Sequence, residues 1–177
     1  MSGGDRPQTE LPMSRQRDSR ALADASALQR IRTLAYLLDN AIPIPGTRYR
    51  IGLDPIMGLI PGGGDVVGLF LSAYLVLECL RFRLPTETLF RMVGNLVLDS
   101  ILGLLPGMGD FFDAVWKSNA RNLALLEAHL ANPVESEAAD RQTVALMAIA
   151  VVAIVGGISL LMASLLRALL TALTAVG

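Results

Sequence analysis

Five aspartates are the residues whose type and spacing best suit a chemical role in this chain. They are Asp54, Asp65, Asp99, Asp110 and Asp113. The first four form two pairs with the same internal spacing, so two similar units packed about a pseudo-twofold axis would bring four carboxylates together. Converging carboxylates in an apolar setting would bind a hard cation such as Mg²⁺ or Ca²⁺, or would raise one another's pKa and relay protons. These aspartates are therefore the candidate functional or ion-binding residues.

Three of these aspartates have a simpler explanation as helix caps. Asp54 precedes a proline, Asp65 follows a run of glycines, and Asp110 follows a Gly-Met-Gly turn. An aspartate in such a place accepts a hydrogen bond from the first turn of the following helix, which stabilises that helix by about 1 kcal/mol. We favour the cap over the ion site for all three.

Asp99 differs because it falls inside a predicted helix, among leucines and isoleucines. A carboxylate in that setting requires a partner. Asn95, four residues earlier on the same helix face, is one candidate, and Arg91 and Arg121 are the others. We favour a structural pair over a functional acid at this position.

An internal repeat carries both aspartate pairs. Leu53–Gly68 and Leu98–Asp113 are identical at nine of sixteen positions, which predicts two similar supersecondary units that pack together. Each copy contains a Pro-Gly break between helical segments, so we expect two glycine-hinged helical hairpins. The predicted hinge residues are Gly58, Pro61, Gly62, Gly64, Gly103, Pro106, Gly107 and Gly109.

Helical periodicity and breakers divide the rest of the chain. Residues 1–20 are polar and predict a disordered arm, and residues 21–131 form a helical repeat domain. Its units span about 53–84 and 86–113, and an amphipathic helix follows over 110–131. Within this domain we expect helices over Asp18–Asp39, Val66–Phe82 and Thr86–Leu105. An acidic linker covers 132–141.

The C-terminal stretch Val144–Leu166 contains no charged residue. Its twenty-three residues would span ~34 Å as a helix, against ~30 Å for the hydrocarbon core of a bilayer, so we predict a transmembrane helix. Nearly all arginines precede it, which places the N-terminal bulk on the cytoplasmic side of a bacterial inner membrane and the short tail outside. The small-residue pairs Ala153/Gly157 and Ser159/Ala163 would support self-association.

The sequence leaves open whether the repeat itself enters the bilayer. The apolar residues of Leu89–Leu105 contribute roughly −3 to −6 kcal/mol to insertion. Asp99 costs about +2.5 to +3.5 kcal/mol, and Arg91 near the end of the segment costs somewhat less, so the sum is close to zero. Val66–Leu80 would be ~22 Å long, which is too short to cross alone. A re-entrant or interfacial helix pair, or an apolar domain docked on the membrane, suits both segments better than two ordinary spans.

Composition narrows the classes of function. The chain of 177 residues is 53% hydrophobic, with a mean hydropathy of +0.51 and a net charge of −1. A single cysteine, Cys79, excludes an intramolecular disulfide, and the single histidine, His129, has no second histidine or cysteine beside it. No Gly-Lys-Ser/Thr follows the glycine-rich loop, and basic residues do not cluster with aromatic ones. We therefore expect no cofactor, no assigned metal, no nucleotide and no nucleic acid.

The tandem Leu-Asp-x6-Pro-Gly-x2-Asp motifs resemble those of a family of small membrane-associated proteins from bacteria and fungi, which is known only as a domain of unknown function. The similarity covers roughly Arg32–Leu130 and includes Asn119-Ala120-Arg121-Asn122. It leaves the C-terminal helix outside. The family has no established activity, so the resemblance implies no mechanism.

These observations predict an all-α membrane protein without a catalytic activity. The leading hypothesis is a membrane-anchored scaffold that binds itself or another membrane protein, with a partner surface at Phe111, Phe112 and Trp116. The alternative is a small ion- or proton-conducting component that uses the aspartates at the broken helices.

Overall fold

The computed structural model describes residues 13–53, 57, 64–103, 117–132 and 138–176, and these are mostly helical, as predicted. The helices are α1 (Met13–Asn40), α3 (Gly64–Cys79), α4 (Thr86–Gly103), α6 (Ser118–Ala131) and α7 (Arg141–Val176), with a short 3-10 helix η1 (Leu80–Phe82). Two short antiparallel strands, β1 (Ile42–Pro43) and β2 (Arg50–Ile51), form a hairpin after α1.

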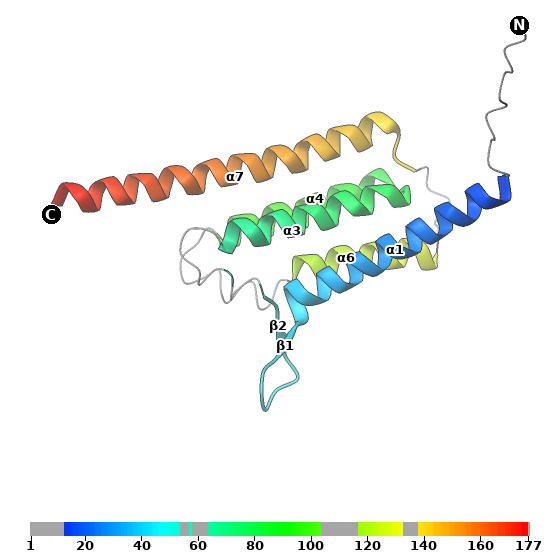
Figure 1. Ribbon diagram of the computed structural model, residues 1–177, viewed down its shortest axis with the longest axis horizontal. Helices are drawn as coiled ribbons and strands as arrows, with labels where there is room; N and C mark the ends of the chain where they lie inside the picture. Colours follow the sequence, from blue (N-terminus) through cyan, green and yellow to red (C-terminus); the bar gives the residue numbers. More distant parts are fainter. Residues whose placement is uncertain (1–12, 54–56, 58–63, 104–116, 133–137, 177) are drawn as a thin grey trace, which may run out of the picture.

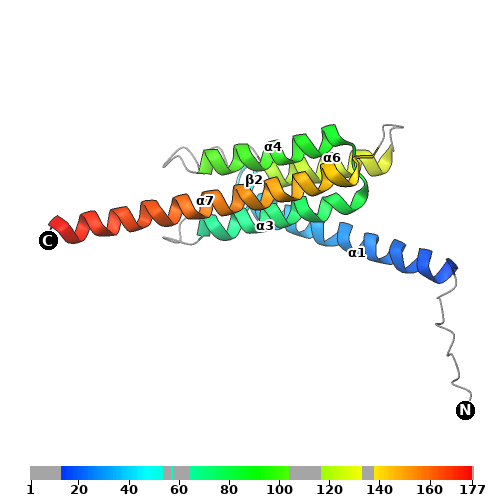
Figure 2. The ribbon, with the colours of Figure 1, turned by 90° about the horizontal axis from the view of Figure 1, so that it is seen from above.

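The helices are arranged in layers (Figure 1). α1 packs beside α6, and both contact the pair α3 and α4. α7 lies along the opposite side of that pair, and the view from above shows it over the space between α3 and α4 (Figure 2). The second half of α7 continues past the ends of α3 and α4 (Figure 1). The hairpin points away from α7.

The core lies where these layers meet. The apolar residues of α1 recur at helical spacing, and their inner stripe is buried against α3 and α6. α7 contributes three buried side chains one turn apart. The largest fully buried apolar side chains are Ile31, Leu38, Leu75, Leu84, Leu89, Met92, Leu96, Leu126, Val76 and Val151.

α1 begins earlier than its sequence predicts. The expected helix runs from Asp18 to Asp39, and residues 1–20 were expected to be a disordered arm, but the helix already includes Met13. Adding turns to a helix that is nucleated by packing costs little, because each added residue forms one more hydrogen bond. The first three turns therefore extend into solvent with exposed Arg17 and Arg20.

The prediction of an amphipathic helix over residues 110–131 is corrected for the residues that the structure describes, from Lys117 onward. Lys117 has a left-handed backbone with φ 50°, which interrupts the helical hydrogen-bond pattern, and α6 begins at Ser118. Leu130, expected on the apolar side, is 40% exposed. The buried side of the first turns is polar instead, with Ser118, Asn119 and Asn122.

The start of α7 is fixed to the connection between η1 and α4. The backbone N–H of Ala139 donates to the carbonyl of Leu84 at 3.0 Å, and the carboxylate of Asp140 accepts the backbone N–H of Thr143 at 2.6 Å. This cap lowers the pKa of Asp140 below its usual value of 3.8. α7 is long and apolar enough to cross a membrane, and only 17% of its most apolar stretch is buried.

Candidate functional site

The structure places two of the five candidate aspartates. Asp99 lies in the second half of α4 and is half-buried, and Asp65 is the second residue of α3. The side chain of Asp65 lies outside the described residues, as do Asp54, Asp110 and Asp113. The convergence of the carboxylates therefore stays a prediction.

The other predicted site residues divide in the same way. Gly64 opens α3 and Gly103 closes α4. The remaining hinge and partner-surface residues lie outside the described residues: Gly58, Pro61, Gly62, Pro106, Gly107, Gly109, Phe111, Phe112 and Trp116.

Gly64 is required by a close approach of two backbone segments. A Cβ at this position would lie 1.4 Å from the carbonyl oxygen of Met57, and no shift of a flexible side chain could relieve that contact. Any other residue at the start of α3 would therefore push apart the two segments that meet there.

Two of the three partners suggested for Asp99 have contacts elsewhere. The side-chain amide of Asn95 donates to Asn122 at 2.8 Å, and Arg91 forms an ion pair with Glu87 at 2.5 Å. Arg91, Asn95 and Arg121 also line an open groove of about 390 Å³ between α4 and α6.

The best-defined polar site belongs to a different aspartate, Asp39, in the last turn of α1. Its side chain is buried, with 6% exposure, and it reaches the N-terminus of α6. The backbone N–H of Ala120 donates to one carboxylate oxygen at 2.7 Å, and the side-chain amide of Asn119 donates to the other at 2.9 Å. Asp39 therefore acts as an N-cap for a helix eighty residues away, which replaces the local cap that α6 lacks at Lys117.

Lys117 completes this contact from the other side. Its left-handed backbone turns the chain into α6, and its ammonium group donates to the side-chain carbonyl of Asn40 at 2.6 Å. Asp39 and Asn40 are adjacent in α1. They accept hydrogen bonds from Ala120 and Lys117, at the start of α6. The end of α1 and the beginning of α6 are joined as one unit.

α6 is also joined to α4. The contact is made by Asn122, which lies one turn after Asn119 in α6. Asn122 accepts the hydrogen bond of Asn95 and donates to the carbonyl of Met92 at 3.4 Å. Asn119 and Asn122 are both almost fully buried. We call Asp39, Asn95, Asn119 and Asn122 the buried polar cluster, which connects three helices.

The buried polar cluster has a structural role, because its hydrogen bonds hold α1, α4 and α6 together. Burial raises the pKa of Asp39 above its usual value of 3.8, while the hydrogen bonds from Ala120 and Asn119 and the charge of Lys117 act in the opposite direction. Donors already occupy both oxygens of this carboxylate. Among the described residues no group of three or more His, Cys, Asp or Glu side chains could hold a metal ion.

Sequence reasoning missed Asp39 as a site residue. Its signal was the pair Leu38-Asp39, which repeats the Leu-Asp pair that opens each copy of the internal repeat. A second signal was the spacing of Asn119 and Asn122, which places two amides on one face of a helix. Neither pattern identifies its partner, because the contacts join segments far apart in the chain.

Fold and cluster together define an all-α protein with a polar lock in its body and a C-terminal helix able to cross a membrane. The family described as Domain of unknown function (DUF4112) matches residues 27–130, more than half of the chain, and the chain belongs to this family. The match confirms the expected resemblance; it contains the buried polar cluster and ends before α7. No curated protein and no solved structure matches the chain.

Proposed function

We propose that this protein is a membrane-anchored helical scaffold without catalytic activity. The family region, residues 27–130, would be the interaction module, and α7 would hold it at the bilayer. The observation that supports this most is the exposure of α7, because large apolar side chains along its length face solvent and not the core. Exposed apolar surface of this extent marks a membrane or protein contact.

The proposal includes a side of the membrane and a class of partner. The arginines that precede α7 would keep the body on the cytoplasmic side of a bacterial inner membrane. Two glycine-hinged hairpins, about 53–84 and 86–113, would form part of the body, and the partner surface would lie at Phe111, Phe112 and Trp116. The partner would be a second copy or another membrane protein, and the exposed small residues Ala153 and Gly157 would allow close approach of two α7 helices.

Membrane fractionation of the intact chain tests the anchor. We expect the protein to stay in the membrane pellet through washes with high salt and alkaline carbonate. Leu160→Arg should shift it toward the soluble fraction, because replacing leucine by arginine costs about 3–4 kcal/mol on the insertion scale. Leu160 is 74% exposed, so the substitution leaves the core intact.

Leu22→Arg in α1 is the matched control, because Leu22 is 72% exposed. It adds the same charge at the same exposure on the other side of the molecule, and should leave the distribution unchanged. Release of the wild-type protein by salt alone would contradict the proposal.

A further inference from the structure

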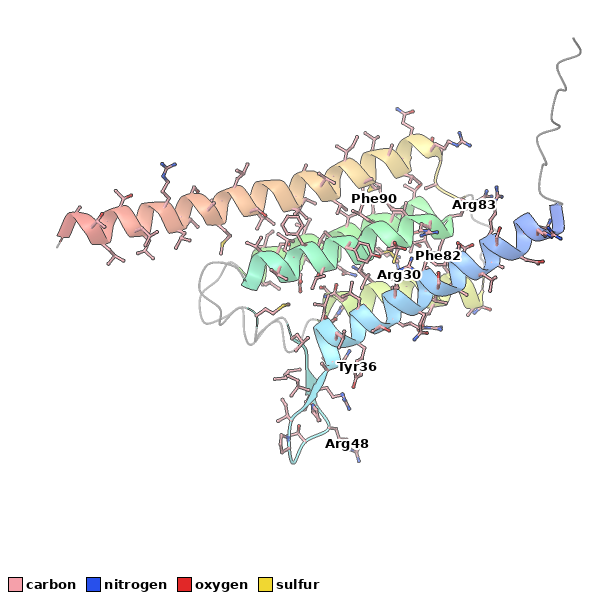
Figure 3. All side chains as sticks on the ribbon, viewed as in Figure 1. Arg30, Tyr36, Arg48, Phe82, Arg83 and Phe90 are labelled. Atoms are coloured by element: carbon pink, nitrogen blue, oxygen red, sulfur yellow. The ribbon has the colours of Figure 1, made fainter. Side chains whose placement is uncertain are left out.

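The two outer sides of the helical body have opposite character. The side formed by α1, α6 and the hairpin carries charged groups, including the ion pair of Arg32 and Glu127 at 2.7 Å. Arg48 lies at the hairpin, which points away from α7 on this side (Figure 3). We call this the charged side.

The opposite side, formed by α7 and the part of α4 that lies toward it, exposes large apolar side chains. Phe90 of α4 lies toward α7 in Figure 3. Between Arg141 and Arg167, α7 has no charged residue. We call the following exposed residues the apolar side: Phe90 of α4, and Leu146, Ile149 and Val152 of α7.

This sidedness restricts how α7 can meet a membrane. Met147, Val151 and Val155 are buried against the body, so the first half of α7 is docked along α3 and α4. Arg30 and Arg48 lie beside this docked half and not beyond either of its ends (Figure 3). If residues 144–166 stood across the bilayer with the body docked, these arginines would lie at hydrocarbon depth, where each charge costs several kcal/mol.

A body lying flat on the membrane avoids that cost. With α7 toward the lipid, the apolar side meets the hydrocarbon and the charged side faces water. An amphipathic helix lies in the interface plane, with its apolar face buried about 5–10 Å into the boundary between headgroups and acyl chains, and we expect the same of this surface.

We propose that the apolar side is a lipid-contact surface, and that the docked half of α7 lies in the plane of one leaflet and does not cross the bilayer. The occupant of this surface is the acyl-chain region of the membrane. The inference rests on the proposed membrane anchoring, and it deepens that proposal by replacing a crossing helix with a flat contact in which α4 takes part.

Nitroxide labels on single introduced cysteines test the orientation. The native Cys79 is fully buried, and burial raises the pKa of its thiol to about 12, so it will not react with a methanethiosulfonate label at neutral pH. Labels on L146C, I149C, A153C and L160C would follow the outer face of α7, F90C would report on α4, and R48C would be the control on the charged side. Each intact protein is reconstituted in vesicles of phosphatidylethanolamine and phosphatidylglycerol, and depth is measured from accessibility to oxygen and to a water-soluble nickel chelate.

We expect the labels at 146, 149 and 153 to have similar depths in lipid, because this part of α7 would lie parallel to the membrane. The label on α4 should be shallower by about the 8–10 Å that separates packed helices, and the label at residue 48 should be in water. A depth that increases from residue 146 to residue 153, by ~10 Å over seven residues, and decreases again at residue 160 would show a crossing helix with its midpoint near residue 155. That result would overturn the inference while leaving the membrane anchor intact. Water exposure at every α7 position would contradict the anchor as well. Labels on α7 shielded from both oxygen and nickel, with spin–spin broadening, would show that a second copy covers the surface and would also overturn the inference.

Discussion

The carboxylate of Asp39 joins α1 to α6 through buried hydrogen bonds, so replacing this single side chain tests how much the contact contributes to stability. Asp39→Ala would leave the N–H of Ala120 and the amide of Asn119 buried without an acceptor. We expect this change to lower the free energy of unfolding by about 1–3 kcal/mol. Chemical denaturation in detergent micelles, followed by circular dichroism, measures the loss. Asp24→Ala, at an exposed position of the same helix, should change stability by less than about 0.5 kcal/mol.

The same carboxylate predicts a pH dependence of stability. Because burial raises the pKa of Asp39 in the folded state above 3.8, the folded protein holds this proton more tightly than the unfolded chain. The contribution of Asp39 to stability therefore falls as pH rises from 3.8 through the folded-state pKa, and is constant above it. The stability difference between wild type and Asp39→Ala should shrink over that range. A difference that grows with pH would mean that the hydrogen bonds and Lys117 outweigh burial.

Asp99 separates the two proposed classes of function. Under the scaffold proposal, Asp99→Asn should leave the proton permeability of reconstituted vesicles unchanged and lower stability by about 1 kcal/mol through a weakened polar contact. Permeability is followed with a pH-sensitive dye inside the vesicles, at equal amounts of folded protein. A flux in the wild type that disappears in Asp99→Asn, with stability unaltered, would favour the conducting component instead.

At the scale of elements, the sequence predicts most helices because their signals are local. The apolar spacing of Leu28, Ile31 and Leu38 fixes the inner face of α1. A 3-10 turn ending at Phe82 and the proline at 85 separate α3 from α4 near where breakers were expected. The C-terminal helix follows from its uncharged length alone.

The elements that escaped prediction depend on distant contacts. α6 begins at Ser118 and not near residue 110, because Lys117 adopts a left-handed conformation and Asp39 supplies the cap. Nothing local to Lys117 signals this, since a lysine has no preference for positive φ. The buried polar cluster was missed for the same reason: its four residues come from three helices, and its hydrogen bonds join segments far apart in the chain.

At the scale of the whole molecule, α7 is both a candidate membrane anchor and a part of the core, whereas the sequence predicts it only as an anchor. It was expected to be an anchor joined to the body by a linker, yet one of its faces belongs to the core. Cutting the chain after Asp140 would therefore expose the cores of α3 and α4 as well as remove the anchor. Substitutions inside the intact helix separate these roles more cleanly than a truncation.

Adjacent valines of α7 provide the sharpest test of that dual role. Val151 is 0% exposed and packs in the core, whereas Val152 is 62% exposed on the apolar side. Val151→Ala should lower the free energy of unfolding by about 1.5–3 kcal/mol, from the two lost methyl groups and the cavity they leave, while Val152→Ala should cost close to nothing in detergent. If α7 instead detaches from the body and crosses the membrane alone, both valines face lipid and the two variants should have equal stability in vesicles. A difference that persists in vesicles therefore requires α7 to remain docked in the bilayer, and a docked α7 brings α3, α4 and their flanking apolar residues to the membrane with it.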